Sequence, residues 1–216
     1  MGTGHCVLVV PGLAVRRYVE PAVTALQDRG LGAQLLPAPG QPGVPADLRA
    51  YGEELAHRIG PGPVELLLGL SVGAQAAAVA AAAAGAGVRH LVLCGPTVDP
   101  RARTTPGLLG RWLGAGRVEP PQLAASQVPD WIGAGPRRLS TVVRSALALP
   151  LEEVLPAVRS RLTVVHGGRD LVTSHAYAAA LAAAHGGLLV VVPGATHSWP
   201  YADERRFADV VSGLLS

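Results

Sequence analysis

Lysine is absent from this chain of 216 residues, and all 18 basic residues are arginines. Aromatic residues are also scarce, with one Phe, four Tyr and three Trp. The 15 acidic residues leave a formal net charge of +3, and no block of like charges is present. Nucleic-acid-binding domains cluster their basic residues and often use aromatic rings to stack bases. We therefore expect no nucleic-acid partner.

Cysteine is almost absent too, because the chain contains only Cys6 and Cys94. Each lies in or at the edge of an apolar run, which favours two reduced core thiols over a disulfide framework. The metal-binding patterns Cys-x-x-Cys and His-Glu-x-x-His do not occur. A Walker loop and a Gly-x-Gly-x-x-Gly motif after a strand are missing as well. We therefore expect neither a metal nor a nucleotide cofactor.

Long hydrophobic runs are also missing. The alanine-rich stretch 74–86 is too short to span a bilayer and is flanked by glycines. The N-terminus has no basic region, and the apolar stretch 6–10 is shorter than the core of a signal peptide. We expect a cytoplasmic protein with no membrane partner. The arginine-only, alanine-rich composition is typical of a GC-rich, bacterial genome.

Six short apolar runs have the length of strands, at 6–10, 33–36, 64–68, 91–94, 162–166 and 188–192. Most are continuously apolar rather than alternating, which is typical of strands covered on both faces in a parallel sheet. Segments with helical spacing or composition lie between and after them, at 19–29, 46–59, 72–84, 174–185 and 202–214. This alternation predicts a single α/β domain over residues 1–216, with a doubly wound, mostly parallel sheet.

A long insertion separates the fourth run from the fifth. Residues 97–161 are rich in proline and include Trp112 and Trp131, and their latter part, 137–158, has helical spacing. The insertion is too long for a bare loop. We interpret it as a helical cap over the carboxyl ends of the strands, where open α/β sheets bind ligands.

The motif Gly69-Leu70-Ser71-Val72-Gly73 lies between the run 64–68 and the alanine-rich helix. A serine on such a strand-to-helix turn has the context of a nucleophile elbow, in which the flanking glycines leave room for a crowded backbone. The helix N-terminus also directs its positive dipole end at the site. We therefore predict that Ser71 is a nucleophile rather than an incidental serine in a glycine-rich turn.

A serine hydroxyl needs a base to remove its proton, and a carboxylate orients that base. Asp170 follows the run 162–166 and is the preferred acid. Asp99 follows the run 91–94 and is the alternative, although it also suits a turn or a helix N-cap. His197 lies in the loop directly after the last strand and is the candidate base.

The other six histidines fit the role of base less well. His57, His175 and His185 fall in predicted surface helices, and His5 and His90 precede strands, at the wrong edge of the sheet. His166 ends a strand, where it would pack or hydrogen-bond beside the site.

Acyl transfer also needs N–H donors for a developing oxyanion. One candidate is the backbone N–H of Val72, the residue after the nucleophile. The other is the N–H of Leu13 in the loop after the first strand, where Gly12 permits a close backbone approach.

Four segments together resemble the alpha/beta-hydrolase superfamily over essentially the whole chain. They are the Pro-Gly-Leu loop at 11–13, the Gly-Leu-Ser-Val-Gly motif, His-Gly-Gly-Arg-Asp at 166–170 and Gly-Ala-Thr-His at 194–197. Gly-Pro-Thr-Val-Asp-Pro-Arg at 95–101 is similar to the cap opening of compact bacterial serine hydrolases. The resemblance implies Ser71, Asp170 and His197 as nucleophile, acid and base, with Leu13 and Val72 at the oxyanion hole.

The resemblance also implies a sheet of six strands in the order 2-1-3-4-5-6. The two antiparallel N-terminal strands common in the superfamily would be lacking. Pro11 stands where the superfamily more often has His, which leaves the geometry of the oxyanion donors open.

The predicted cap supplies apolar side chains for a substrate pocket, chiefly Leu108, Trp112 and Trp131, with Leu109, Leu113 and Ile132 nearby. Each could instead pack the cap onto the body. An apolar pocket favours a hydrophobic ester or thioester as the small-molecule substrate. Residues 99–161 also contain nine Arg against five acidic residues. A carrier-bound substrate with an anionic arm, such as a phosphopantetheine thioester, is a further hypothesis beside a merely solvated basic surface.

Three functions fit these residues. The preferred one is a serine hydrolase that cleaves an ester or thioester through an acyl-enzyme. An acyltransferase or cyclase of a natural-product pathway would use the same three side chains. A non-catalytic binding protein on the same fold is the third, although the intact Ser, Asp and His positions argue against it. The oligomeric state stays open.

Overall fold

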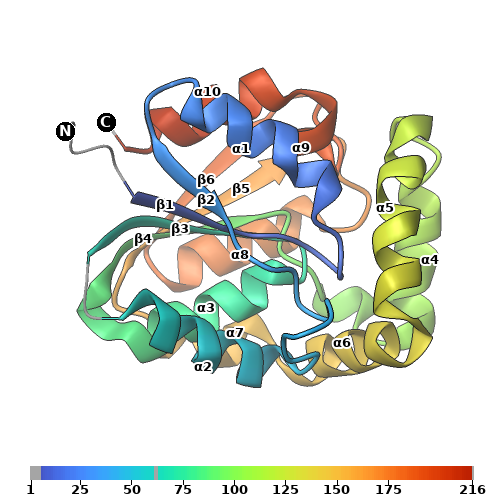
Figure 1. Cartoon of the computed structure of the whole chain (residues 1–216), viewed down its shortest axis with the longest axis horizontal. Helices are drawn as coiled ribbons and strands as arrows, with labels where there is room; N and C mark the ends of the chain where they lie inside the picture. Colours follow the sequence, from blue (N-terminus) through green and yellow to red (C-terminus); the bar gives the residue numbers. More distant parts are fainter. Residues whose placement is uncertain (1–5, 61–62, 216) are drawn as a thin grey trace.

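The six apolar runs form one sheet in the computed structural model, which describes residues 6–60 and 63–215 (Figure 1). All neighbouring strands are parallel, in the spatial order β2-β1-β3-β4-β5-β6, so the predicted order is confirmed. The strands are β1 (Cys6–Val10), β2 (Gly32–Leu35), β3 (Val64–Leu70), β4 (Val88–Cys94), β5 (Arg161–Gly167) and β6 (Leu188–Val192).

Strand β4 begins earlier than expected, and this corrects the prediction that His90 precedes the strand. His90 lies inside β4 and is buried, and its Nε2 lies 2.9 Å from Oγ1 of Thr163 on β5. Burial, assisted by the nearby Arg161 guanidinium, lowers the pKa of His90 to about 4. His90 is therefore a neutral histidine that joins two strands in the core.

Helices cover both faces of the sheet, as Figure 1 shows. The first face carries α1 (Glu20–Gln27) and α10 (Glu204–Gly213), which bury Leu26 and Phe207 against it. The opposite face carries α2 (Leu48–Ile59), α3 (Gly73–Ala84) and α8 (His175–Ala184). The chain therefore leaves β1 and β3 toward opposite sides of the sheet, and the crevice between their carboxyl ends is where such folds bind ligands.

Helix α3 owes its close contact with the sheet to its small side chains. Alanine is the strongest helix former, and every residue from Gly73 to Ala81 is buried. Helix α2 packs tightly against α3 in turn, because a Cβ on Gly52 would lie only 2.5 Å from Cβ of Val79. These two contacts fix the position of the α3 N-terminus, directly after Ser71.

The insertion contains three long helices, α4 (Thr105–Ala115), α5 (Pro121–Ala134) and α6 (Pro136–Ala148), followed by the short α7 (Leu151–Val154). The spacing at 137–158 identified only α6 and the short turns after it. Figure 1 shows α4, α5 and α6 at the side of the molecule toward which β1 runs. Pro106, Pro121 and Pro136 each lie in the first turn of a helix, where a missing N–H is tolerated. Residues 105–148 are called the α4–α6 segment below.

The helix predicted at 202–214 is α10 in the structure, and a short helix that was not predicted precedes it. The short α9 (Trp199–Ala202) ends at Asp203, whose φ of −149° and ψ of 71° are not helical. The Asp203 carboxylate then accepts a hydrogen bond from the Arg206 N–H and caps α10. Among residues 6–60 and 63–215, no helix combines the length and the apolar character that crossing a membrane requires.

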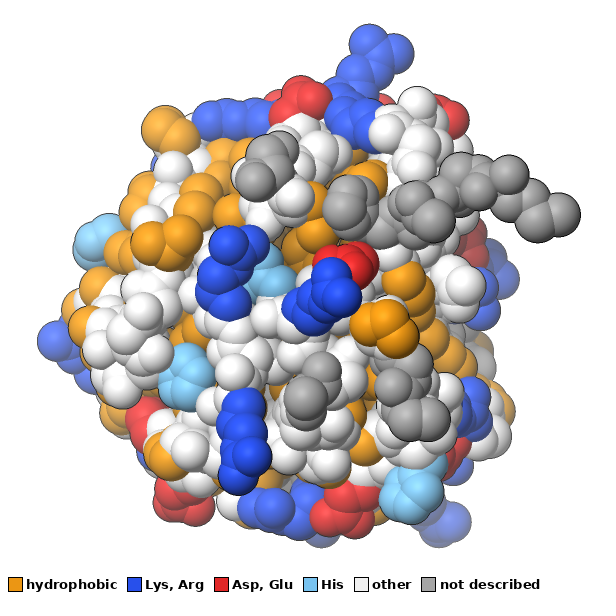
Figure 2. Space-filling view, turned by 90° about the vertical axis from the view of Figure 1, so that its left-hand side faces the viewer, with side chains coloured by type: hydrophobic (Ala, Val, Ile, Leu, Met, Phe, Trp, Pro, Cys, Tyr) orange, Lys and Arg blue, Asp and Glu red, His pale blue; other side chains and the backbone are white. Residues whose placement is uncertain are grey.

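Arginines on the face at the amino ends of the strands are scattered among neutral side chains (Figure 2). Two of them have defined partners there. Arg89 forms an ion pair with Glu65 at 2.7 Å, and Arg161 donates to the carbonyl oxygen of Leu214 at 2.8 Å. These arginines join neighbouring elements.

The contact between α2 and α3 generates a stability prediction. We expect Gly52→Ala to lower the free energy of unfolding by about 2 kcal/mol, because the new methyl group overlaps Val79. The matched control is Gly110→Ala in α4, where a Cβ would meet no atom within 4 Å. That change should raise stability by about 0.5 kcal/mol, since alanine loses less backbone entropy in a helix. Urea unfolding measures both, and equal effects would contradict the packing described here.

Candidate active site

Ser71 occupies the sharp turn between β3 and α3. Its φ of 55° lies in the left-handed region, which is uncommon for a residue other than glycine. The flanking glycines permit this turn. A Cβ on Gly69 would lie 2.5 Å from Cα of Ala74, and one on Gly73 would lie 2.6 Å from the carbonyl oxygen of Val10. The turn therefore places Ser71 at the carboxyl edge of the sheet, as the sequence predicted.

Ser71, His197 and Asp170 form a continuous hydrogen-bonded chain. Nε2 of His197 lies 3.0 Å from Oγ of Ser71, and Nδ1 of His197 lies 2.9 Å from Oδ2 of Asp170. His197 comes from the loop after β6, and Asp170 comes from the turn after β5. The structure thus brings together the three side chains that the sequence singled out.

The Asp170 carboxylate is buried and fixed at both oxygens. Its Oδ1 accepts hydrogen bonds from the backbone N–H groups of Val172, at 2.8 Å, and Thr173, at 2.9 Å, while Oδ2 faces His197. Burial alone would raise the pKa of Asp170, but the His197 ring and the two backbone donors outweigh it and lower the pKa below the usual value. Asp170 is therefore an ionised partner for the imidazole.

His197 is likewise shielded from solvent. Burial alone would lower its pKa, but the Asp170 carboxylate and the more distant Glu119 outweigh burial, so the pKa of His197 is raised. Gly95, with a φ of 54°, leaves room beside this pair. A Cβ at that position would lie 3.1 Å from two atoms of the His197 ring and 3.2 Å from Oδ2 of Asp170.

Asp99, the alternative acid, does not contact His197. Its Oδ1 accepts from the Arg101 N–H, which caps the short 3-10 helix Pro100–Ala102. Its Oδ2 pairs with Arg111 of α4 at 2.8 Å and accepts from the Ser174 hydroxyl. The same guanidinium donates to the carbonyl oxygen of Val172 at 3.0 Å. Asp99 therefore anchors α4 to the segment that follows Asp170.

The other histidines have different environments. His166 ends β5 and is buried, with its ring centroid 5.4 Å from that of His175. No described residue hydrogen-bonds its Nδ1. Burial lowers the pKa of His166, and the His175 and His197 rings add to this effect although Asp170 opposes it. Nδ1 of His57 lies 2.8 Å from the carbonyl oxygen of Glu53 within α2, and His5 lies outside the described residues.

The loop after β1 is held from outside by α5. Nε1 of Trp131 donates to the carbonyl oxygen of Leu13 at 2.9 Å. The Asp130 carboxylate accepts from the backbone N–H groups of Arg16 and Arg17 at 2.8 and 3.1 Å. Within the described part of the chain, the N–H groups of Leu13 and Val72 donate to no acceptor. Both predicted donors are therefore free to bind a ligand oxygen.

A cavity of about 320 Å³ opens beside Ser71 and His197. The predicted pocket residues Leu108, Trp112 and Trp131 all line it. So do Gly12, Leu13, Val15, Tyr18, Val72, Thr97, Thr105, Leu109, Gln127, Leu139, Val143, Val172 and Ser198. The two indoles pack edge to face with ring centroids 5.3 Å apart. The walls are mostly apolar, and no formally charged side chain other than the titratable His197 lines this cavity.

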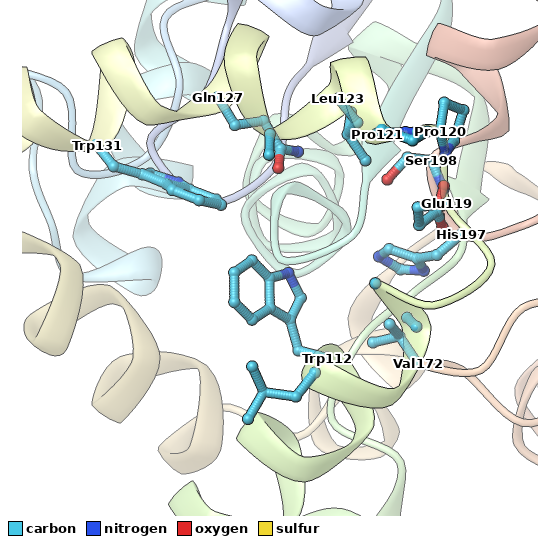
Figure 3. A pocket seen from close by; sticks show the side chains of 14 residues that line it. Trp112, Glu119, Pro120, Pro121, Leu123, Gln127, Trp131, Val172, His197 and Ser198 are labelled. Carbon is cyan, nitrogen blue, oxygen red and sulfur yellow. Dashed lines mark hydrogen bonds between the residues drawn. The ribbon is translucent and has the colours of Figure 1, made fainter.

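A second cavity of about 190 Å³ adjoins the first (Figure 3). The two share six lining residues, which are Trp112, Gln127, Trp131, Val172, His197 and Ser198. Leu113 lines only the smaller cavity, whereas Ile132 lines neither and is 76% exposed. None of the nine arginines between 99 and 161 lines either cavity, so the idea of an anionic substrate arm stays a prediction.

Glu119, between α4 and α5, is a site residue that the sequence reasoning missed. Its Oε2 accepts from the Thr196 hydroxyl at 2.9 Å, and its Oε1 accepts from the Ser198 N–H at 3.0 Å. These partners flank His197 on both sides. They lie 77 and 79 positions away in the chain, and no local motif marks Glu119. Among the described residues, no group of three or more His, Cys, Asp or Glu could hold a metal ion.

Solved structures with a similar fold cover almost the whole chain. A bromoperoxidase from Bacillus anthracis matches with a TM-score of 0.78 at 15% identity, over 99% of this chain and 92% of that one. A putative lipase from Acinetobacter baumannii AYE matches with a TM-score of 0.79 at 16% identity, over 100% and 84%. An enol-lactonase from Burkholderia xenovorans LB400 matches with a TM-score of 0.74 at 16% identity, over 99% and 92%. At such identities the likeness concerns the fold alone.

Sequence comparison identifies the family. A search of curated proteins found no match. A family model described as the alpha/beta hydrolase family matches residues 3–210. Because this match spans nearly the entire sequence and agrees with the parallel six-stranded sheet, the chain belongs to the alpha/beta hydrolase family.

Proposed function

We propose that this protein is a serine hydrolase that cleaves an ester or thioester of a hydrophobic acyl substrate. The observation that carries the proposal is the hydrogen-bonded chain from Ser71 through His197 to Asp170, with links of 3.0 and 2.9 Å. A serine hydroxyl linked to an imidazole, which a carboxylate orients in turn, is the arrangement that activates a nucleophile in acyl transfer.

In the proposed reaction, Ser71 Oγ attacks the substrate carbonyl carbon while its proton passes to Nε2 of His197. The ionised Asp170 stabilises the imidazolium, which then gives the proton to the departing alkoxide or thiolate. A water molecule attacks the acyl-enzyme by the same route and releases the acid. Asp170 is suited to its role because its second oxygen is fixed by two backbone N–H groups, which hold the carboxylate in one orientation.

The backbone N–H groups of Leu13 and Val72 are the proposed donors for the tetrahedral oxyanion. Support comes from their positions, one in the loop after β1 and the other directly after Ser71, and from the lack of any acceptor for them among the described residues. Preorganised donors of this kind lower the barrier because they meet the negative charge as it develops.

Residues 97–161 act in this proposal as a helical cap within a single domain. Its side chains supply most of the apolar wall around Ser71, including Leu108, Trp112 and Trp131. An apolar cavity without a formal positive charge favours a neutral, hydrophobic acyl group. The cap would exclude water from the larger cavity when a substrate fills it, which strengthens the electrostatic interactions at the reacting carbon.

Glu119 is proposed as a positioning residue for the base. The charged and titratable groups that face His197 are Asp170, Glu119 and His166. Asp170 holds the ring itself, whereas Glu119 holds the backbone and side chain on either side of it. Its negative charge also favours the imidazolium that forms when Ser71 loses its proton.

The roles of the two strand-end carboxylates can be separated by matched substitutions. We expect Ser71→Ala and Asp170→Asn to lower kcat by about four to six orders of magnitude on p-nitrophenyl esters of graded acyl length. Asp99→Asn should keep kcat within about tenfold, because Asp99 supports α4 and does not contact His197. All rates are to be divided by the fraction of each variant that is folded. Full activity of Ser71→Ala, or equal losses for both aspartates, would refute the assignment.

The contribution of Glu119 should be visible in the pH dependence of kcat/KM. Neutral His197 is the base, so activity falls as the pH drops through its raised pKa. Glu119→Gln keeps an acceptor for the Ser198 N–H but removes a negative charge, which should lower the pKa of His197. The acid limb of the profile should therefore move to lower pH. Glu65→Gln, at the opposite end of the sheet, is the control and should leave the profile in place. An unmoved limb in Glu119→Gln would contradict this role.

A further inference from the structure

Gln127 of α5 has a polar side chain that the fold itself does not use. It is only 8% exposed, yet within residues 6–60 and 63–215 its amide has no hydrogen-bond partner. Figure 3 shows this amide directed from α5 into the cavity, between Trp131 and Leu123. The amide is not among the fully enclosed polar atoms that lack a partner, so it is open to the cavity and a ligand can reach it. A ligand that fills this space without offering a hydrogen bond would leave the amide unpaired, which is unfavourable.

Gln75 of α3 is also buried, and its hydrogen bonds show a structural role that Gln127 lacks. Nε2 of Gln75 in α3 donates to the carbonyl oxygens of Ala146 and Leu149 at 2.8 and 2.6 Å. Its Oε1 faces the Thr97 hydroxyl at 3.5 Å. Gln75 thereby joins α3 to the end of α6. Gln127 makes no contact of this kind, so its donor and acceptor are both available to a ligand.

Gln127 lies where the two cavities of the candidate site adjoin. It lines both the larger cavity, which contains Ser71, and the smaller cavity, which contains Glu119. His197 and Ser198 also line both. A substrate with its carbonyl at Ser71 that extends from the larger cavity into the smaller one would therefore pass Gln127, whether its acyl group or its leaving group lies on that side.

The lining limits the chemistry of the group that Gln127 could bind. The walls around it are apolar, and Trp131 already donates its N–H to Leu13. The one carboxylate in the lining, Glu119, repels an anion. A neutral group that has both a hydrogen-bond acceptor and a donor matches the Gln127 side chain, which offers both. A secondary amide is such a group.

We propose that Gln127 is a specificity-determining residue that hydrogen-bonds a neutral secondary amide in the substrate, near the bond that is cleaved. This inference rests on the proposed hydrolase function and makes its substrate class narrower. The preferred substrates are apolar esters or thioesters that carry an amide either in the acyl chain or in the leaving group. An unsubstituted hydrocarbon chain would leave the buried amide without a partner and would bind less well.

The test compares each amide-bearing substrate with a hydrocarbon analogue of the same length. One arm uses p-nitrophenyl esters with and without an amide in the acyl chain. The second arm uses octanoyl thioesters of N-acetylcysteamine and of pentane-1-thiol, whose chain after the sulfur has the same length. In at least one arm, the wild-type protein should favour the amide by about tenfold or more in kcat/KM, as expected for one well-formed hydrogen bond.

Gln127→Met preserves the length of the side chain and removes both hydrogen-bonding groups. In this variant the preference for the amide should fall to about twofold or less, because kcat/KM decreases for the amide substrate and increases for the hydrocarbon analogue. The matched control is Gln122→Met on the same helix, because Gln122 is exposed and lines neither cavity. A preference that survives in Gln127→Met, or no preference in either arm for the wild-type protein, would overturn the inference.

Binding to the Ser71→Ala protein separates this inference from the proposed function. Calorimetric titration of the same substrate pairs measures the preference without turnover. If the wild-type protein hydrolyses none of the compounds, the hydrolase proposal fails. The role of Gln127 then stands if Ser71→Ala binds the amide member about tenfold more tightly and Gln127→Met in that background abolishes the difference. Equal binding of both members would reject it.

Discussion

The close approach of α3 to the end of β3 is the constraint on which the site depends. Ser71 can adopt a φ of 55° only because Gly69 and Gly73 leave space for the backbone of α3 and of the β1 loop. The small side chains of α3 and Gly52 of α2 keep that helix in place. The parallel sheet then brings the ends of β5 and β6 to the same edge, so Asp170 and His197 meet the serine with no further rearrangement.

The α4–α6 segment contributes more than a pocket wall, because it is bonded to each loop of the site. Trp131 and Asp130 hold the loop after β1, and Arg111 reaches the segment after Asp170 through Asp99 and the carbonyl oxygen of Val172. Glu119, between α4 and α5, holds the residues on both sides of His197. A ligand that shifts these helices would therefore also shift the groups that we propose for the chemistry.

Local patterns in the sequence predict the sheet and the three central side chains, because a strand followed by a turn residue is a short-range signal. The helices α4 and α5 could not be predicted in this way, because prolines and glycines interrupt their hydrophobic pattern. Only the structure shows that Pro106 and Pro121 lie in the first turns of these helices. Pro129 even lies inside α5. Glu119 and Gln127 could not be identified at all. What distinguishes them is the contacts made or left unmade after folding, between residues far apart in the chain.

The most direct test of the central claim is covalent labelling of the intact protein with a fluorophosphonate, followed by peptide mass spectrometry. The account predicts one adduct, on the Ser71 hydroxyl, which forms much more slowly in His197→Ala because the imidazole no longer accepts the proton. Ser71→Ala should remain unlabelled. A wild-type protein that resists the reagent, or an adduct on a different serine, would contradict the claim that this hydroxyl is an activated nucleophile.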